Sequence, residues 1–182
     1  MALCGIDEAG RGPIAGSLVV AGVILKEPVQ GLTDSKKLTE KRREALYPEI
    51  LEKSRFHIVS FSAAAVDEKG ISACMTEALR QIQQNLQSGD YLFDGNTTFG
   101  VENLRTMVKA DAQIPEVSAA SILAKVTHDR EMIAFSIEYP QYGFEKHKGY
   151  GTAAHIEAIR QHGYSDVHRR SFRLKALEPT LF

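Results

Sequence analysis

The chain has 182 residues, of which 43% are hydrophobic and 25% are charged, and its formal net charge is −1 at pH 7. This composition predicts one domain spanning residues 1–182, with enough apolar side chains for a core and with a short basic C-terminal tail. It excludes a whole-molecule attraction to nucleic acid, so such binding would need local basic patches. No apolar run reaches the roughly 18 residues of a membrane helix, and no signal peptide is evident. We therefore expect a cytoplasmic protein with no membrane partner.

Apolar runs rich in β-branched residues predict strands, and apolar residues at helical spacing predict helices. In chain order these are strands at 3–7 and 18–25, a helix from Thr39 to about Lys53, a strand at 55–62, a helix at 71–86, strands at 91–94 and 105–109, and helices at 116–138 and 152–162. The alternation predicts an α/β domain with helices covering the sheet. Two adjacent strands before the first helix predict some antiparallel pairing, and so a mixed sheet.

Carboxylates stand at the ends of several predicted strands. Asp7 and Glu8 end the first strand and precede the glycine-bracketed arginine of residues 10–12, Asp94 ends a later strand, and Asp111 follows the next. Ligands gather outside strand ends in open α/β sheets, so these acids are expected to converge. Converging carboxylates repel unless cations lie among them, and oxygen ligands suit Mg²⁺ or Mn²⁺. Taken singly, each acid could equally be a turn or surface residue.

Gly10, Gly12 and Ala15 also satisfy the relaxed dinucleotide-binding fingerprint. That fingerprint needs a helix that opens on the glycines, whereas here the chain leads into the apolar run of residues 18–25. Asp7 and Glu8 would also place negative charge beside a bound pyrophosphate. Dinucleotide binding is therefore kept only as an alternative.

The stretch GIDEAGRGPIAG at residues 5–16 closely resembles the opening motif of bacterial ribonuclease HII, the type 2 ribonuclease H. The resemblance covers nearly the whole chain through DSKKL (34–38), FDG (93–95), KAD (109–111), SAASILAKVTHD (118–129), HKGYGT (147–152) and HRRSF (168–172). It implies a ribonuclease H-like fold, with a mixed central sheet flanked by helices on both faces. It also implies an endonuclease that uses Mn²⁺ or Mg²⁺ to hydrolyse the RNA strand of RNA–DNA hybrids and to nick at single ribonucleotides in duplex DNA, leaving 5′-phosphomonoesters. Another nuclease or recombinase of the same fold remains an alternative.

By motif match, the catalytic and metal-binding carboxylates fall on Asp7, Glu8, Asp94 and Asp111. The backbone of Gly10-Arg11-Gly12 is expected to contact the ribose 2′-hydroxyl, with Tyr150 stacking on the following deoxyribose. Further candidate substrate contacts are Ser35, Lys36, Lys37, Ser121, Lys125, His147, Lys148 and Arg169.

Two positions depart from the family pattern. Ala110 stands where glycine is usual and could change how Asp111 is presented, while His128 stands where arginine is usual and is expected to alter only a pairing on a helix surface. His155 and His162 are expected at the surface. We expect the chain to act as a monomer on a hybrid or ribonucleotide-containing duplex.

Overall fold

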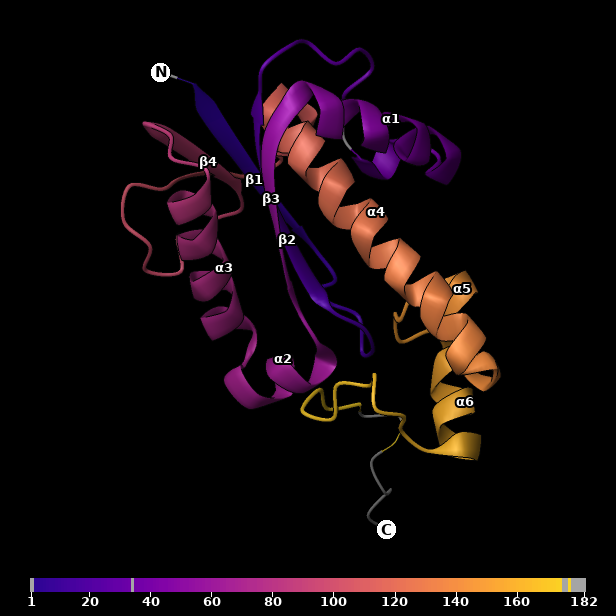
Figure 1. Cartoon of the computed structure of the whole chain (residues 1–182). Coiled ribbons are helices and arrows are strands. Elements are labelled where there is room, and N and C mark those ends of the chain that lie inside the picture. The colour runs from indigo at the N-terminus through magenta and orange to yellow at the C-terminus, as the bar shows by residue number, and fades with distance from the viewer. Residues whose placement is uncertain (1, 34, 175–176, 178–182) are drawn as a thin grey trace.

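The computed structural model describes residues 2–33, 35–174 and 177, which contain a five-stranded sheet in the order β3-β2-β1-β4-β5 (Figure 1). The strands are β1 (Leu3–Ala9), β2 (Leu18–Leu25), β3 (Ser54–Phe61), β4 (Asp90–Asp94) and β5 (Arg105–Met107). β1, β2 and β3 pair antiparallel, whereas β4 and β5 run parallel to β1. The mixed sheet predicted from the sequence is therefore confirmed.

Helices cover both faces of this sheet (Figure 1). They are α1 (Glu40–Lys53), α2 (Ala63–Lys69), α3 (Ile71–Asn85), α4 (Pro115–Glu138), α5 (Phe144–His147) and α6 (Ala153–His162), with 3-10 turns η1 (Ser35–Lys37), η2 (Ala110–Ala112) and η3 (Pro140–Tyr142). Successive residues of β2 point to opposite faces, so Leu18 and Val20 pack with α3 while Val19 and Ala21 pack with α1 and α4. Two apolar layers therefore enclose the sheet.

Local sequence signals account for the starts of α1 and α6. Thr39 and Thr152 accept hydrogen bonds from the backbone nitrogens of Arg42 and His155, as N-cap residues do. Pro48 lies inside α1, on its exposed side. Helix α2 and the short helices within residues 139–151 were not predicted.

The central strand β1 lies very close to α4. A Cβ atom added to Gly5 would lie 2.3 Å from the backbone of Glu116 and Val117, so only glycine permits this approach. The contact holds the first turn of α4 against the amino-terminal half of β1, and α4 then runs toward the loop that follows β1, where His128 lies close to Gly10.

The C-terminal segment returns to the loop that follows β1. Gly16 donates from its backbone nitrogen to the carbonyl of Val167, and Arg169 donates likewise to Ile14, around an isolated bridge between Ala15 and His168. The first and last parts of the fold are thereby joined. Within the described residues, no helix is long and apolar enough to cross a membrane.

Candidate active site

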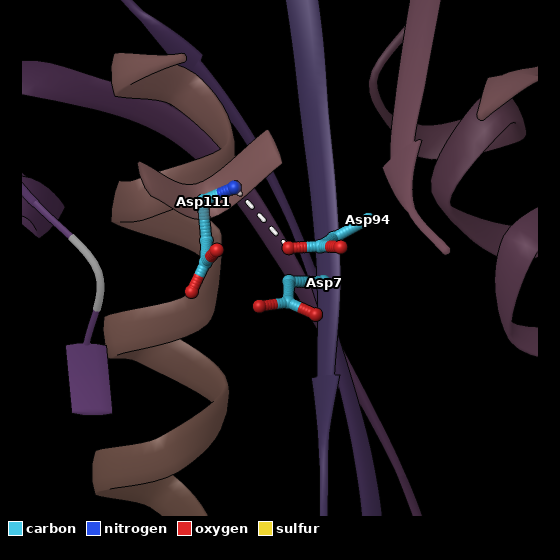
Figure 2. A group of neighbouring side chains, drawn as sticks. All are labelled: Asp7, Asp94 and Asp111. Carbon is cyan, nitrogen blue, oxygen red and sulfur yellow. Dashed lines mark hydrogen bonds between the residues drawn. The ribbon is translucent and has the colours of Figure 1, made fainter. Parts of the chain in front are cut away.

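Three carboxylates from different elements meet at the centre of the sheet (Figure 2). Ile6 pairs with Phe93 in parallel register, so the residues that follow them, Asp7 within β1 and Asp94 at the end of β4, lie side by side on adjacent strands. Asp111 joins them from η2, and one oxygen atom from each carboxylate lies within 4.8 Å of the others. The structure thus brings together three of the four predicted acids.

The Asp94 carboxylate also organises the segment that carries Asp111. Its two oxygens accept hydrogen bonds from the backbone nitrogens of Lys109 at 3.0 Å and Asp111 at 3.2 Å. Lys109 has a φ of 59°, which turns the chain into η2. The neighbouring Ala110 lies buried in that 3-10 turn, a conformation that does not require glycine. This departure from the family pattern is therefore compatible with the observed placement of Asp111.

Burial and the neighbouring carboxylates disfavour negative charge on Asp7 and Glu8. Burial, followed by the charge on Glu8, raises the pKa of Asp7 well above its usual value. Burial also raises the pKa of Glu8, although the guanidinium of Arg11, 3.6 Å away, acts against it. Within the described part of the chain, Glu8 Oε2 is buried without a hydrogen-bond partner. Crowded carboxylate oxygens with an unsatisfied member fit a hard divalent cation, which would supply the missing charge.

A pocket opens over these acids. Its lining comprises Asp7, Glu8, Lys36, Lys37, Asp94, Val108, Lys109, Asp111, Ala112 and Ser121. Glu8 therefore faces the same space as the three clustered aspartates, and the predicted cations Lys36 and Lys37 lie at its edge. Sequence reasoning did not select Lys109, because its left-handed backbone and its bond to Asp94 depend on tertiary contacts.

The structure places Tyr150 beside the glycine loop. A Cβ atom added to Gly12 would lie 3.7 Å from Cε1 of Tyr150, whose side chain is half exposed. Gly10 is different, since its φ is +79° and an added Cβ would lie 2.2 Å from the carbonyl oxygen of Ser17. Arg11 is half exposed and also lies over the ring of Phe99. The two predicted sugar-contacting features are therefore neighbours.

The guanidinium of Arg169 is not exposed at the surface, as a direct contact with a substrate phosphate would require. Its side chain is fully buried, and the guanidinium donates to the carbonyls of Gly10, Arg11, Pro13 and Gly16. Burial lowers the pKa of Arg169 to about 10, so it remains charged at pH 7. The prediction of a direct contact is wrong for this residue, because its donors face the loop of residues 10–16.

Other predicted substrate contacts make bonds within the protein. Ser35 and Ser121 share a hydrogen bond of 2.7 Å between their hydroxyls, and Lys125 pairs with Asp129 at 2.8 Å. His147 bonds the carbonyl of Tyr142 through Nε2, and Lys148 donates to the carbonyl of Glu145. Their substrate roles stay predictions.

Two histidines predicted at the surface are buried. His128 is 1% exposed and faces the glycine loop, since an added Cβ on Gly10 would lie 2.7 Å from His128 Cδ2. The expected surface pairing is therefore wrong, because this side of α4 packs on the loop after β1. His155 is 0% exposed and bonds His168. One feature of the sequence indicates that His155 is buried. It lies four residues before Ile159 on α6, so the two side chains share a face of the helix, and Ile159 is buried.

The dinucleotide-binding alternative is also wrong, because the loop after Gly12 leads into β2 and no helix opens there. A mixed sheet with carboxylates gathered on its central parallel strands instead defines a ribonuclease H-like α/β protein. The family model for ribonuclease HII matches residues 4–175. The chain belongs to the ribonuclease HII family, as its motifs predicted.

Individual relatives match over nearly their full length. The chain is 67% identical over 181 residues to ribonuclease HII of Sulfurovum sp. (strain NBC37-1), covering 99% of this chain and 96% of that protein. It is 60% identical over 177 residues to ribonuclease HII of Aliarcobacter butzleri (strain RM4018), covering 96% and 92% respectively.

Two solved structures have the same fold as this chain. The ribonuclease HII in the PCNA complex from Archaeoglobus fulgidus has a TM-score of 0.83 at 28% identity, covering 100% of this chain and 98% of that one. Ribonuclease H2 from Pyrococcus horikoshii OT3 has a TM-score of 0.76 at 27% identity, covering 94% of each chain. The predicted ribonuclease H-like fold is confirmed.

Proposed function

We propose that this chain is a metal-dependent endonuclease that hydrolyses the RNA strand of RNA–DNA hybrids and nicks at single ribonucleotides in duplex DNA. The observation that carries this function is the convergence of Asp7, Asp94 and Asp111 next to the unpartnered oxygen of Glu8. Membership of the ribonuclease HII family supports the same reaction class.

In this proposal Asp7, Glu8, Asp94 and Asp111 hold Mg²⁺ or Mn²⁺. Ions held there would supply an activated water and stabilisation of the leaving oxygen of a phosphodiester. The chain contributes the alignment of the carboxylates, which the hydrogen bonds from Lys109 and Asp111 to Asp94 maintain. The expected product carries a 5′-phosphate.

Substrate selection is assigned to the glycine loop and its neighbour. The 2′-hydroxyl distinguishes RNA from DNA and can both donate and accept hydrogen bonds. The backbone between Gly10 and Gly12 would approach it without side-chain obstruction, and the exposed ring of Tyr150 would stack on the next sugar. Lys36 and Lys37 at the pocket edge would contact phosphates.

We further propose that one copy of the chain, acting as a single domain in the cytoplasm, is sufficient. Light scattering of the active protein checks this, and a stable dimer would contradict it.

The decisive experiment uses end-labelled duplex DNA with one ribonucleotide, an all-DNA duplex of the same sequence, and Mn²⁺. Nicking beside the ribonucleotide alone is the expected result. The Asp94→Asn variant, purified in parallel, controls for contaminating nucleases. Equal cleavage of both duplexes, or none of either, would refute the proposed function.

A further inference from the structure

A buried histidine pair connects the Tyr150 region with the C-terminal segment. Nε2 of His155, on α6, lies 3.0 Å from Nε2 of His168. At the other side of its ring, His155 Nδ1 lies 2.9 Å from the carbonyl oxygen of Tyr150. His168 Nδ1 lies 2.9 Å from the backbone nitrogen of Ser165 and 2.8 Å from its hydroxyl. All four ring nitrogens therefore have partners.

These partners fix the proton positions. The carbonyl of Tyr150 can only accept, so His155 Nδ1 carries a proton and its Nε2 is an acceptor. The backbone nitrogen of Ser165 can only donate, so His168 Nδ1 is an acceptor and its Nε2 carries the proton. The bonds then run in one direction, from Ser165 through His168 and His155 to Tyr150, with both rings neutral.

The surroundings favour this neutral arrangement. The rings of Tyr142 and Phe144 pack against both histidines, and His147 stacks on His155 with 4.2 Å between ring centroids. Burial lowers the pKa of both His155 and His168 to about 4. At neutral pH the pair is therefore uncharged.

Arg169, which follows His168 in the sequence, holds the glycine loop, the other half of the proposed sugar site. Its guanidinium binds four carbonyls of the glycine loop, and its backbone nitrogen donates to Ile14. Arg169 thus anchors the glycine loop, and His168, acting through His155, anchors the carbonyl of Tyr150. Between them, a Cβ atom added to Gly12 would lie 3.7 Å from Cε1 of Tyr150.

We propose that His168 and Arg169 are positioning residues that fix the spacing between Gly12 and Tyr150, and that the selection of a single ribonucleotide depends on this spacing. The inference rests on the proposed function. A lone ribonucleotide offers one 2′-hydroxyl in one register, whereas a long hybrid offers many registers along its A-form surface. A loosened spacing should therefore impair cleavage at the lone ribonucleotide more.

Three variants separate this role from general stability. His168→Leu removes the donor to His155, whereas His168→Gln keeps an N–H group near the position of Nε2. His155→Asn keeps a donor toward the Tyr150 carbonyl and breaks only the link to His168. His162→Gln is the control, because His162 is an exposed residue of the same helix as His155.

The readout is kcat/KM on a duplex with one ribonucleotide, divided by kcat/KM on a long hybrid. For His168→Leu and His155→Asn this ratio should fall roughly five- to tenfold, for His168→Gln less, and for His162→Gln not at all. Calorimetric Mn²⁺ affinity should be unchanged, because the carboxylates are intact. Circular dichroism checks that each variant folds. If His168→Leu does not fold, the result for His155→Asn decides the test.

Equal losses on both substrates, with no advantage for His168→Gln, would overturn the inference and leave the pair a purely structural element. Wild-type protein that cleaves neither substrate would refute the proposed function instead, so the two failures are distinct.

Discussion

The backbone nitrogen of Asp111 donates a hydrogen bond to the carboxylate of Asp94 across 3.2 Å. Asp94 therefore both faces the pocket and aligns the residue that completes the acidic cluster. We expect Asp94→Asn and Asp7→Asn each to lower turnover at least a hundredfold while hybrid binding survives, because phosphate contacts supply most of the affinity. Only Asp94→Asn should speed amide hydrogen exchange at Lys109 and Asp111. Wild-type turnover in either variant would disprove the ligand assignment.

Metal dependence follows from the repulsion among the acids. Activity should vanish in excess chelator and return with Mg²⁺ or Mn²⁺, but not with Ca²⁺, whose looser coordination suits this chemistry poorly. The same ions should raise the melting temperature, because they bind only the folded arrangement. Full activity in chelator would contradict the metal site.

Asp7→Asn should stabilise the metal-free protein. The folded-state pKa of Asp7 is raised by burial and by Glu8, so its ionised form at pH 7 disfavours folding. An amide of the same shape removes that charge. We expect a higher melting temperature in chelator, by roughly 2–4 °C for each kcal/mol regained, and no further increase when Mg²⁺ is added. A lower melting temperature would show that the ionised carboxylate makes compensating bonds.

Tyr150→Ala should reduce kcat/KM at a lone ribonucleotide by roughly 1–3 kcal/mol, about ten- to a hundredfold, and reduce cleavage of a long hybrid less. Since the ring is 45% exposed, its removal should leave no core cavity. Phe56→Ala, on the edge strand β3 and 40% exposed, is a control that should change neither activity. Parallel losses on both substrates would remove Tyr150 from the sugar site.

Alanine substitutions of Gly10 and Gly12 make a matched pair of tests of the loop. Gly10→Ala should destabilise the protein by more than about 1 kcal/mol, because its positive φ disfavours a side chain and Cβ would collide with the Ser17 carbonyl. Gly12→Ala leaves an ordinary contact of 3.7 Å to Tyr150, so melting should not change while single-ribonucleotide nicking declines. Thermal unfolding and the nicking assay together check both; full nicking by Gly12→Ala would separate this position from ribose recognition.

Acid should weaken the fold through the histidine pair. The pKa values of His155 and His168 are about 4 when folded and near 6.5 when unfolded, so the unfolded chain binds protons first as the pH falls. Their contribution is intact above pH 6.5 and is lost between about 6.5 and 4, by at most roughly 2 kcal/mol for each histidine at pH 5.

Urea unfolding from pH 7.5 to 5 measures this loss, with His155→Asn/His168→Leu as the comparison. Protonation of Asp7 and Glu8 acts in the opposite direction because it relieves their repulsion. The difference between the two proteins therefore isolates the histidines. If the free energy of unfolding of the double variant fell as steeply with pH as that of the wild type, the prediction would be disproved.

The sequence was informative where local pattern and chemistry coincide. Asp7 and Asp94 each follow an apolar run that predicts a strand, so their convergence followed from a general property of α/β sheets, although β1 continues past Asp7 to Ala9. Arg169 could not be placed in this way, because its burial depends on carbonyls more than 150 residues earlier in the chain. Helix α2 was missed because seven residues are too few for a clear helical period, although Ser62 caps it.

The anchoring of the glycine loop by residues 167–169 has a consequence for how the protein is made. The acids of β1 leave the ribosome early, but the loop beside them lacks its bonds to residues 167–169 until those residues, which lie more than 150 positions later in the chain, have been synthesised. Part of the support of the glycine loop is thus supplied by residues that are synthesised much later than the loop itself. A chain that ends before Val167 would keep every acid of the cluster and the backbone bond from Ile14 to Gly149, but it would lack the bonds of residues 167–169 to the glycine loop.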